Sequence, residues 1–270
     1  MTKHQNFKLL PNRMIGVEAI SADSSATFGK HTHDQFGVGL MDRGGHQSAS
    51  GRGTVQAWAG DVITVNPGEV HDGAPIGSAG RSWRMFYFEP SVIAEVAQDI
   101  TGQASGQTEF ASPVIRDKKL ALRFGKLFDG ATASVSHSLG FDESLLLLLA
   151  PLLRRLPAGS ADPDGTPKSM HSARAMMDDD PAAALSLADL AQEAGLSRYQ
   201  FLRRFTVLTG LTPHAYLVQR RVQLARRLIR QGSRPAEAAV AAGFADQSHM
   251  TRTFVRTVGL TPGACANPAR

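Results

Sequence analysis

Three histidines in the first third of the chain have the residue type and spacing to bind a small molecule or a metal ion. His31 and His33 are separated by one residue, and His71 follows a later apolar run that begins at Gly60. Because side chains two apart on a β-strand point to the same face, His31 and His33 can converge with His71. Neutral imidazoles bind divalent metals and also exchange hydrogen bonds with polar molecules. Three interpretations therefore stay open: a pocket for a small polar effector, a divalent metal site, or structural polar residues.

Two further candidates lie on the aromatic run 82–88, which is typical of a β-strand. Arg84 and Tyr87 can both contribute to binding an anionic group such as a carboxylate. They differ in strand parity, so at most one of them is expected to face the interior with the histidines.

The residues around these candidates have the pattern of an all-β domain. Between Phe28 and Pro90, short runs of β-branched and aromatic residues alternate with turns that contain glycine or proline, such as 43–45 and 66–68. Many short strands at this spacing indicate a sandwich or a barrel. After about residue 117 the apolar residues recur with the period of a helix.

The leucine-rich stretch Phe141–Leu156 predicts a helix that is too apolar to be exposed on all sides. Four leucines are expected to pack on their own domain: Leu145, Leu148, Leu149 and Leu152. Leu146 and Leu153 are expected to contact a partner subunit, which makes this helix a candidate dimer interface. The alternative is a helix buried entirely against the barrel.

Composition and charge change further along the chain. Residues 157–167 have the composition of a flexible linker, and the residues after them are expected to be helical. Residues 168–270 contain 14 Lys+Arg and 7 Asp+Glu, a net charge of +7, whereas residues 1–167 have a net charge of −2. This asymmetry leaves two interpretations open: a C-terminal half that binds a polyanion, or a basic surface that only keeps the protein soluble.

A sequence repeat defines the helical half. One set recurs 49 positions later: Arg203, Phe205 and Gly210–Pro213 correspond to Arg252, Phe254 and Gly259–Pro262. A second set recurs 48 positions later: Ala191, Ala194 and Gly195 correspond to Ala239, Ala242 and Gly243. A small residue, then a turn glycine, then a helix-capping residue (Ser197, Asp246) is the order of a helix-turn-helix motif. Two such units are expected, near 187–209 and 235–258.

A long helix is expected between the two units. Pro213 suits the start of a helix, and the run continues to about Gln231 with an apolar side and an arginine-rich side. A helix of this length spans about 28 Å, which approaches the ~34 Å between successive major-groove faces on one side of DNA. One chain can therefore present two recognition helices to neighbouring half-sites.

The second helix of each unit supplies the candidate base-reading residues. Phe201 and Phe205 are expected to face inward in the first unit, and Met250 and Phe254 in the second. The outward positions are Arg198, Tyr199, Leu202 and Arg203, then Gln247, Ser248, Thr251 and Arg252. Arginine pairs bidentately with guanine and glutamine with adenine, although any single arginine can instead contact only phosphate.

The segments Leu187–Ser197 and Ala242–Phe254, with Gly259–Pro262, resemble the AraC/XylS family of regulators. The resemblance implies base contacts at Tyr199, Leu202, Arg203, Gln247, Ser248 and Arg252. The histidine motifs in turn resemble a cupin barrel of the kind found in AraC-type effector domains. The carboxylate that metal cupins place after the histidine pair is absent, since Asp34 comes too early and positions 36–39 hold no ligand.

The expected fold class is α+β, with an N-terminal cupin-like β-barrel and an all-α double helix-turn-helix domain. The expected parts are an effector-sensing domain (1–100), a helical dimerisation segment (101–156), the linker (157–167) and a DNA-binding domain (168–270). The resemblance implies a transcription regulator, more specifically an activator, with double-stranded DNA, a small-molecule effector, RNA polymerase and a second copy of the chain as partners. No cofactor is expected apart from a possible divalent metal.

The remaining features bear on location and on competing functions. The sequence has no apolar run of transmembrane length, and no apolar segment follows the basic residues at the N-terminus as it does in a signal peptide. Cys265 is the only cysteine, so we expect a cytoplasmic protein without disulfides and without a membrane partner. The alternatives are a metal-dependent cupin enzyme fused to a DNA-binding module, and an architectural DNA-binding protein without a ligand.

Overall fold

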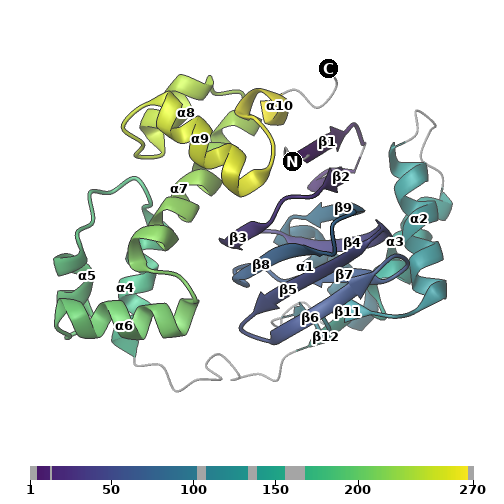
Figure 1. Ribbon diagram of the computed structural model, residues 1–270, viewed down its shortest axis with the longest axis horizontal. Helices are drawn as coiled ribbons and strands as arrows, with labels where there is room; N and C mark the ends of the chain where they lie inside the picture. The colour runs from purple at the N-terminus through teal and green to yellow at the C-terminus, as the bar shows by residue number, and fades with distance from the viewer. Residues whose placement is uncertain (1–4, 13, 102–107, 133–138, 156–167, 267–270) are drawn as a thin grey trace. The chain divides into compact units, whose positions relative to one another are not determined.

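The computed structural model describes residues 5–12, 14–101, 108–132, 139–155 and 168–266 (Figure 1). The chain divides into two compact units, and the border at 161/162 falls inside the expected linker, whose residues 157–167 lie outside the described part. The first unit is rich in β-sheet, and the second is helical.

Two antiparallel sheets form the first unit. The larger sheet has six strands in the spatial order β1 (Gln5–Leu10), β2 (Val17–Ser24), β9 (Arg81–Phe88), β4 (Phe36–Arg43), β7 (Val62–Val65) and β11 (Val114–Ile115). The smaller sheet has four strands in the order β3 (Phe28–His31), β8 (His71–Ile76), β5 (Gly45–Ser50) and β6 (Gly53–Trp58). Contacts between Trp83 on β9 and both Phe28 and His46 of the smaller sheet show that the two sheets face each other. The expected barrel-like domain is therefore present.

Alternate side chains of strand β9 face two different environments, the helices on one side and the smaller sheet on the other. Phe86 and Phe88 are fully buried on the face that meets the helices, where Phe86 contacts Phe124 and Phe128. These residues belong to the largest apolar core of the unit, and the predicted apolar face of helix α2 (Lys118–Thr132) is confirmed. The opposite face of β9 points to the smaller sheet.

The prediction of one helix over 141–156 is wrong at its C-terminal end. Helix α3 runs from Leu139 to Leu149, and residues Leu153–Arg155 form strand β12, which pairs with β10 (Thr108–Phe110). Pro151 explains the break, because proline cannot continue the hydrogen-bond ladder of a helix. A further helix, α1 (Pro90–Thr101), follows β9.

The leucines of this segment divide differently from the expectation. Leu148, Leu149 and Leu152 are buried in their own domain as predicted, and Leu145 packs partly against the same core. Leu146 and Leu153, expected to face a partner, also pack against that core. Among the α3 leucines whose side chains the structure describes, Leu147 is the exposed one, with 44% of its surface accessible.

The second unit contains seven helices within the described residues 168–266. They are α4 (Lys168–Asp179), α5 (Leu187–Glu193), α6 (Arg198–Thr209), α7 (Pro213–Arg230), α8 (Pro235–Ala241), α9 (Gln247–Val258) and α10 (Pro262–Ala266). The pairs α5/α6 and α8/α9 are the two expected helix-turn-helix units, and α7 is the expected long helix between them.

Capping residues explain where helices α6 and α9 begin. Ser197 and Asp246 accept hydrogen bonds from the N–H groups of Gln200 and His249, which caps α6 and α9. Helix α8 begins with Arg234 as its N-cap residue and Pro235 in the first turn.

Helix α7 is anchored to α4 by a partly buried polar network around the buried Tyr216. The Tyr216 hydroxyl donates to Asp178 at 2.7 Å and accepts from Nε of Arg174 at 2.9 Å. Arg220 adds an ion pair to Asp178 at 3.0 Å. Tyr216 is only 4% exposed, so without these bonds its hydroxyl would be buried without a partner. Such a buried, unpaired polar group would destabilise the folded protein.

Candidate effector site and nucleic-acid interface

The three candidate histidines converge between the two sheets. The ring centroids of His31 and His71 lie 4.4 Å apart, and those of His33 lie 5.0 Å from His31 and 5.2 Å from His71. One ring nitrogen from each residue lies within 4.8 Å of the others. His31 and His71 are register partners across β3 and β8, whereas His33 follows the end of β3.

Backbone carbonyls fix the tautomers of two of these rings. Nδ1 of His31 lies 2.8 Å from the carbonyl oxygen of Gly29, and Nδ1 of His71 lies 3.0 Å from that of Glu69. A carbonyl oxygen can only accept, so each Nδ1 carries a proton and each Nε2 of the neutral ring keeps a lone pair. Two Nε2 atoms are therefore available to accept a hydrogen bond or to bind a metal.

Burial keeps the rings of His31 and His71 neutral. It lowers the pKa of His31 to about 4, with a further lowering by His71, and burial is also the main reason why the pKa of His71 is lowered. At neutral pH these two residues therefore offer uncharged imidazoles.

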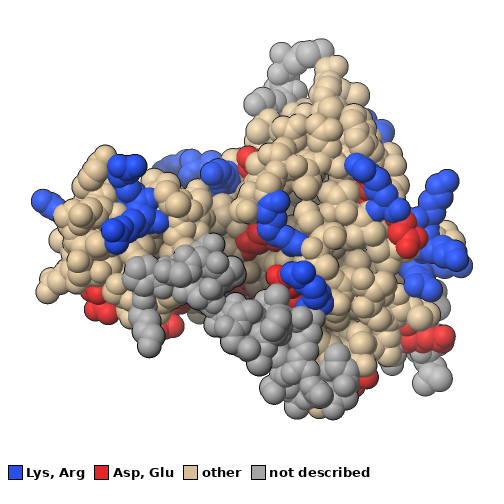
Figure 2. All heavy atoms as spheres, turned by 90° about the horizontal axis from the view of Figure 1, so that it is seen from below, with Lys and Arg blue, Asp and Glu red and all other residues tan. Residues whose placement is uncertain are grey.

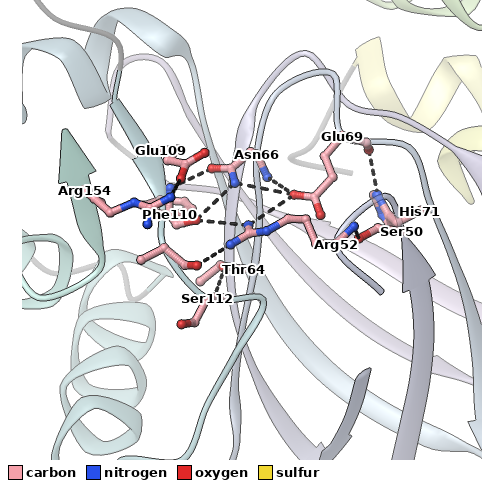
Figure 3. Close-up of polar contacts among 11 residues, drawn as sticks. Ser50, Arg52, Thr64, Asn66, Glu69, His71, Glu109, Phe110, Ser112 and Arg154 are labelled. Atoms are coloured by element: carbon pink, nitrogen blue, oxygen red, sulfur yellow. Dashed lines mark hydrogen bonds and ion pairs between the residues drawn. The ribbon is translucent and has the colours of Figure 1, made fainter. Parts of the chain in front are cut away.

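The turn before β8 holds the histidines in place. Gly68, at φ 73°, donates its N–H to the carbonyl oxygen of His33 at 2.8 Å. Glu69 contributes its carbonyl to His71 and its carboxylate to Arg52, at 3.6 Å (Figure 3). The sequence motif 60–71 thus positions two of the three rings.

The same turn ties the histidine site to the segment that precedes helix α2. Asn66 accepts from the N–H of Phe110 at 2.7 Å and donates to its carbonyl at 3.2 Å (Figure 3). Arg52 donates to the carbonyls of Phe110 and Ala111. Glu109 pairs with Arg154 of β12. A displacement of the turn at 66–69 would therefore act directly on β10 and β12.

Tyr87 faces the histidines, and Arg84 does not. The Tyr87 ring lies 5.0 Å from that of His33. Arg84 instead pairs with Asp42 and Asp129, both at 2.9 Å, and covers the Phe128 ring of α2. As the strand parity predicts, only one of the two residues faces the histidines. The prediction that Arg84 lies near the histidines is wrong, because its position on β9 turns it toward the helices.

Sequence reasoning missed two interior residues, His46 and Arg81. The His46 ring lies 6.4 Å from that of Trp83, and burial together with Arg81 lowers its pKa to about 3. Arg81 has the same parity on β9 as Tyr87, and it is completely buried. The shared parity was a signal available from the sequence.

The first helix-turn-helix unit presents the expected residues. Phe201 and Phe205 are fully buried, while Arg198, Tyr199 and Arg203 are exposed on α6. Tyr199 is 66% exposed, and the Arg203 guanidinium lies over its ring at 5.9 Å. Leu202 is half-buried, so it offers a smaller surface than its three neighbours.

The second unit repeats this arrangement on α9. Met250 and Phe254 are fully buried, and Gln247, Ser248 and Arg252 are exposed. Thr251 is half-buried. The turn glycines Gly195 and Gly243 both have positive φ, 63° and 78°, as the motif requires.

Basic side chains gather on the helical unit. Figure 2 shows groups of Lys and Arg among other residues on this unit, at the left of the view, with acidic side chains at its lower edge. The first unit shows both signs of charge on the same face. A basic surface on a double helix-turn-helix unit is the electrostatic footprint of a DNA-binding domain.

Comparison with known proteins agrees with both units. Residues 15–150 match the AraC-like ligand binding domain, and residues 190–267 match a helix-turn-helix domain. The uncharacterized HTH-type transcriptional regulator YbfI of Bacillus subtilis is 30% identical over 83% of this chain and 81% of its own length. The MmsAB operon regulatory protein of Pseudomonas aeruginosa is 33% identical over 44% of this chain and 37% of its own length.

Solved structures show the same two-domain fold. The crystal structure of an apo ToxT variant from Vibrio cholerae superposes with a TM-score of 0.59 and 11% identity, over 96% of this chain and all of that one. A crystal structure of unsaturated fatty acid bound wild-type ToxT has a TM-score of 0.56 and 12% identity, over 99% and 96% of the two chains.

Fold and surface thus define a transcription regulator that joins a ligand-binding domain to a helix-turn-helix DNA-binding domain. The chain belongs to the AraC family of transcription regulators. No helix within the described residues has the length and apolar character needed to span a membrane.

Proposed function

We propose that a small molecule bound between the two sheets of the first unit alters how the second unit acts on DNA, and that the bound form activates transcription. The observation that carries this proposal is the convergence of His31, His33, His71 and Tyr87 inside a domain of the AraC-like ligand-binding family. The neutral rings supply hydrogen-bond donors and acceptors for a polar ligand. The fatty acid-bound ToxT structure supports a small-molecule occupant in a protein of this fold.

The test is a promoter reporter that carries an operator selected by the full-length protein. Wild type and His71→Ala would be compared in cells grown on single carbon sources, with His171→Ala, an exposed histidine of α4, as the matched control. We expect at least one growth condition to change reporter output for wild type and His171→Ala but not for His71→Ala. Equal responses of all three proteins would contradict the proposal.

A divalent metal is the second candidate occupant, and the two fixed Nε2 lone pairs favour it. Three imidazole ligands suit zinc with an open position, which is also what the alternative of a metal-dependent enzyme requires. Calorimetric titration with zinc distinguishes the two. Micromolar binding that His33→Ala abolishes would favour the metal, and its absence would leave the organic effector as occupant.

We propose that α6 and α9 enter neighbouring major-groove segments, with α7 as the spacer. The exposed residues that would contact bases are Arg198, Tyr199, Leu202, Arg203, Gln247, Ser248, Thr251 and Arg252. An operator with two blocks about one helical turn apart follows from this arrangement.

We also propose a homodimer that contacts RNA polymerase in the cytoplasm, where its DNA partner lies. The apolar residues available for dimer contact are Leu147 of α3 and Leu122 of α2, which is 61% exposed. A hydrogen bond from Arg123 to the carbonyl of Leu147 shows that the two helices adjoin at this place. Sedimentation of wild type and Leu147→Glu tests the dimer.

A further inference from the structure

Arg81 is a buried cation at the start of β9, on the face that points to the smaller sheet. Its side chain is fully inaccessible to solvent, and Nη1 donates to the carbonyl oxygen of Ala26 at 3.1 Å. The guanidinium packs on two adjoining aromatic rings, 5.3 Å from the centroid of Phe28 and 5.1 Å from that of Trp83. Burial lowers the pKa of Arg81 only to about 10, so the side chain stays charged at neutral pH.

Two of its donor atoms are unused. Within the part of the chain that the structure describes, Nε and Nη2 of Arg81 have no hydrogen-bond partner, although both are buried. Other arginines of the same unit have carboxylates: Arg43 pairs with Asp23, and Arg84 pairs with Asp42. A buried charge without a partner is strongly destabilising, so its presence needs a compensating role.

The two unused atoms have a specific geometry. Nε and Nη2 form one edge of the planar guanidinium, and this edge binds both oxygens of a carboxylate through parallel N–H···O bonds. The neighbouring Gly73 has no side chain, and a Cβ there would lie 2.8 Å from Cε1 of His46 and 3.6 Å from Nη2 of Arg81. The glycine therefore lets the His46 ring pack beside the unused edge of Arg81.

We propose that the effector is a small organic carboxylate whose acid group binds the Nε–Nη2 edge of Arg81. This inference rests on the proposed function, because it assigns the chemistry of the molecule that the first unit senses. Trp83 and Phe28 flank the guanidinium and offer apolar contact to the carbon atoms next to the acid group.

The rest of the ligand would meet neutral polar groups. His46 interacts electrostatically with Arg81 and also with His71 and His31, which links the cation to the histidine cluster. The imidazoles lack the charge to neutralise an anion, so the single positive charge matches a single acid group. Hydroxyl or carbonyl groups on the ligand are the natural partners of the histidines and of Tyr87.

Acetate, the simplest carboxylate, tests this assignment without knowledge of the natural effector. The full chain would be labelled with nitrogen-15, and the Nε–H signal of Arg81 would be identified by its loss in Arg81→Lys. A charge-assisted bond of ordinary strength predicts saturation by acetate with a dissociation constant on the order of 10 to 100 mM. Acetamide and sodium chloride at the same concentration should leave the signal unchanged, and so should inorganic phosphate if the site is specific for carboxylate.

An Arg81 signal that does not respond to acetate would overturn the proposal, and so would one that responds equally to acetate and chloride. Arg81→Met supplies a second readout, with exposed Arg43→Met as the matched control. Removal of an uncompensated buried charge should raise the Tm of the ligand-free protein, whereas a structural role predicts a lower Tm. A lower Tm together with an unresponsive signal would assign Arg81 to structure alone.

A failure of the carboxylate assignment can be distinguished from a failure of the proposed function. DNA binding would be measured on the same Arg81→Met protein, which should still bind the operator. A chain that binds its operator but ignores acetate contradicts only the carboxylate assignment. A chain whose Arg81 binds acetate but which selects no DNA contradicts only the proposed function.

Discussion

The two turn glycines of the helix-turn-helix units allow a matched pair of substitutions. Gly195 and Gly243 occupy the same place in the two motifs and have similar positive φ, 63° and 78°. A left-handed conformation costs a non-glycine residue about 1–2 kcal/mol. Gly195→Ala and Gly243→Ala should therefore both lower the free energy of unfolding by roughly that amount.

The space around the missing Cβ makes the two positions unequal. At Gly195 nothing lies within 4 Å of the ideal Cβ position, whereas at Gly243 the Cα and carbonyl oxygen of Ala182 lie at 3.0 and 3.1 Å, with Nε of Arg221 at 3.1 Å. The segment around Ala182 is held by hydrogen bonds from Arg221 to the carbonyls of Pro181 and Ala183, at 2.8 and 3.2 Å. Crowding against a constrained backbone adds about 1–3 kcal/mol, so Gly243→Ala should cost about 2–5 kcal/mol in total.

Urea unfolding with two optical probes measures this difference. The only tryptophans, Trp58 and Trp83, lie in the first unit, so their fluorescence reports that unit, while far-ultraviolet circular dichroism reports the helices of both units, most of which belong to the second unit. Both variants should leave the fluorescence transition unchanged, and Gly243→Ala should shift the helical transition further than Gly195→Ala. Equal losses for the two variants, or a larger loss at Gly195, would refute the reasoning from Cβ space.

Three other predictions concern reading, stability and assembly. Arg252→Ala should relax base preference at one operator position by about 1–3 kcal/mol, and equal weakening on operator and random DNA would instead identify a phosphate contact. Tyr216→Phe should lower the free energy of unfolding by about 1–3 kcal/mol, because it removes the hydroxyl that donates to Asp178. Burial raises the pKa of Tyr216 to about 12. The contribution of the Tyr216 hydroxyl to the free energy of unfolding is therefore complete below pH 10 and is lost as the pH rises toward 12. Between pH 10 and 12 the stability of Tyr216→Phe should depend less on pH than that of wild type. Leu147→Glu should shift sedimentation from dimer toward monomer, and an unchanged dimer would place the interface elsewhere.

The helical half was predictable because its signals are local. Turn glycines, capping residues and the apolar period act within a few residues, so the bounds 187–209 and 235–258 agree with helices α5/α6 and α8/α9. The repeat gave two independent observations of the same motif.

The fold of the first unit was predictable in outline, but the directions of its side chains were less so. The histidine motifs located the cluster, but the pairing of β3 with β8 that brings His31 and His71 together is a long-range property. The orientation of β9 decided between Arg84 and Tyr87, and alternation alone could not say which parity faced inward. Arg81 was missed for that reason, although it shares its parity with Tyr87.

We propose that one chain reads two neighbouring half-sites with α6 and α9. Selection of DNA from a random library by the full-length protein, repeated with Arg203→Ala and Arg252→Ala, tests this proposal most directly. We predict an operator with two short blocks about one helical turn apart, a steep dependence of affinity on salt, and the loss of a different block for each variant. Enrichment of a single block that both variants weaken alike, or no enrichment at all, would contradict the proposal.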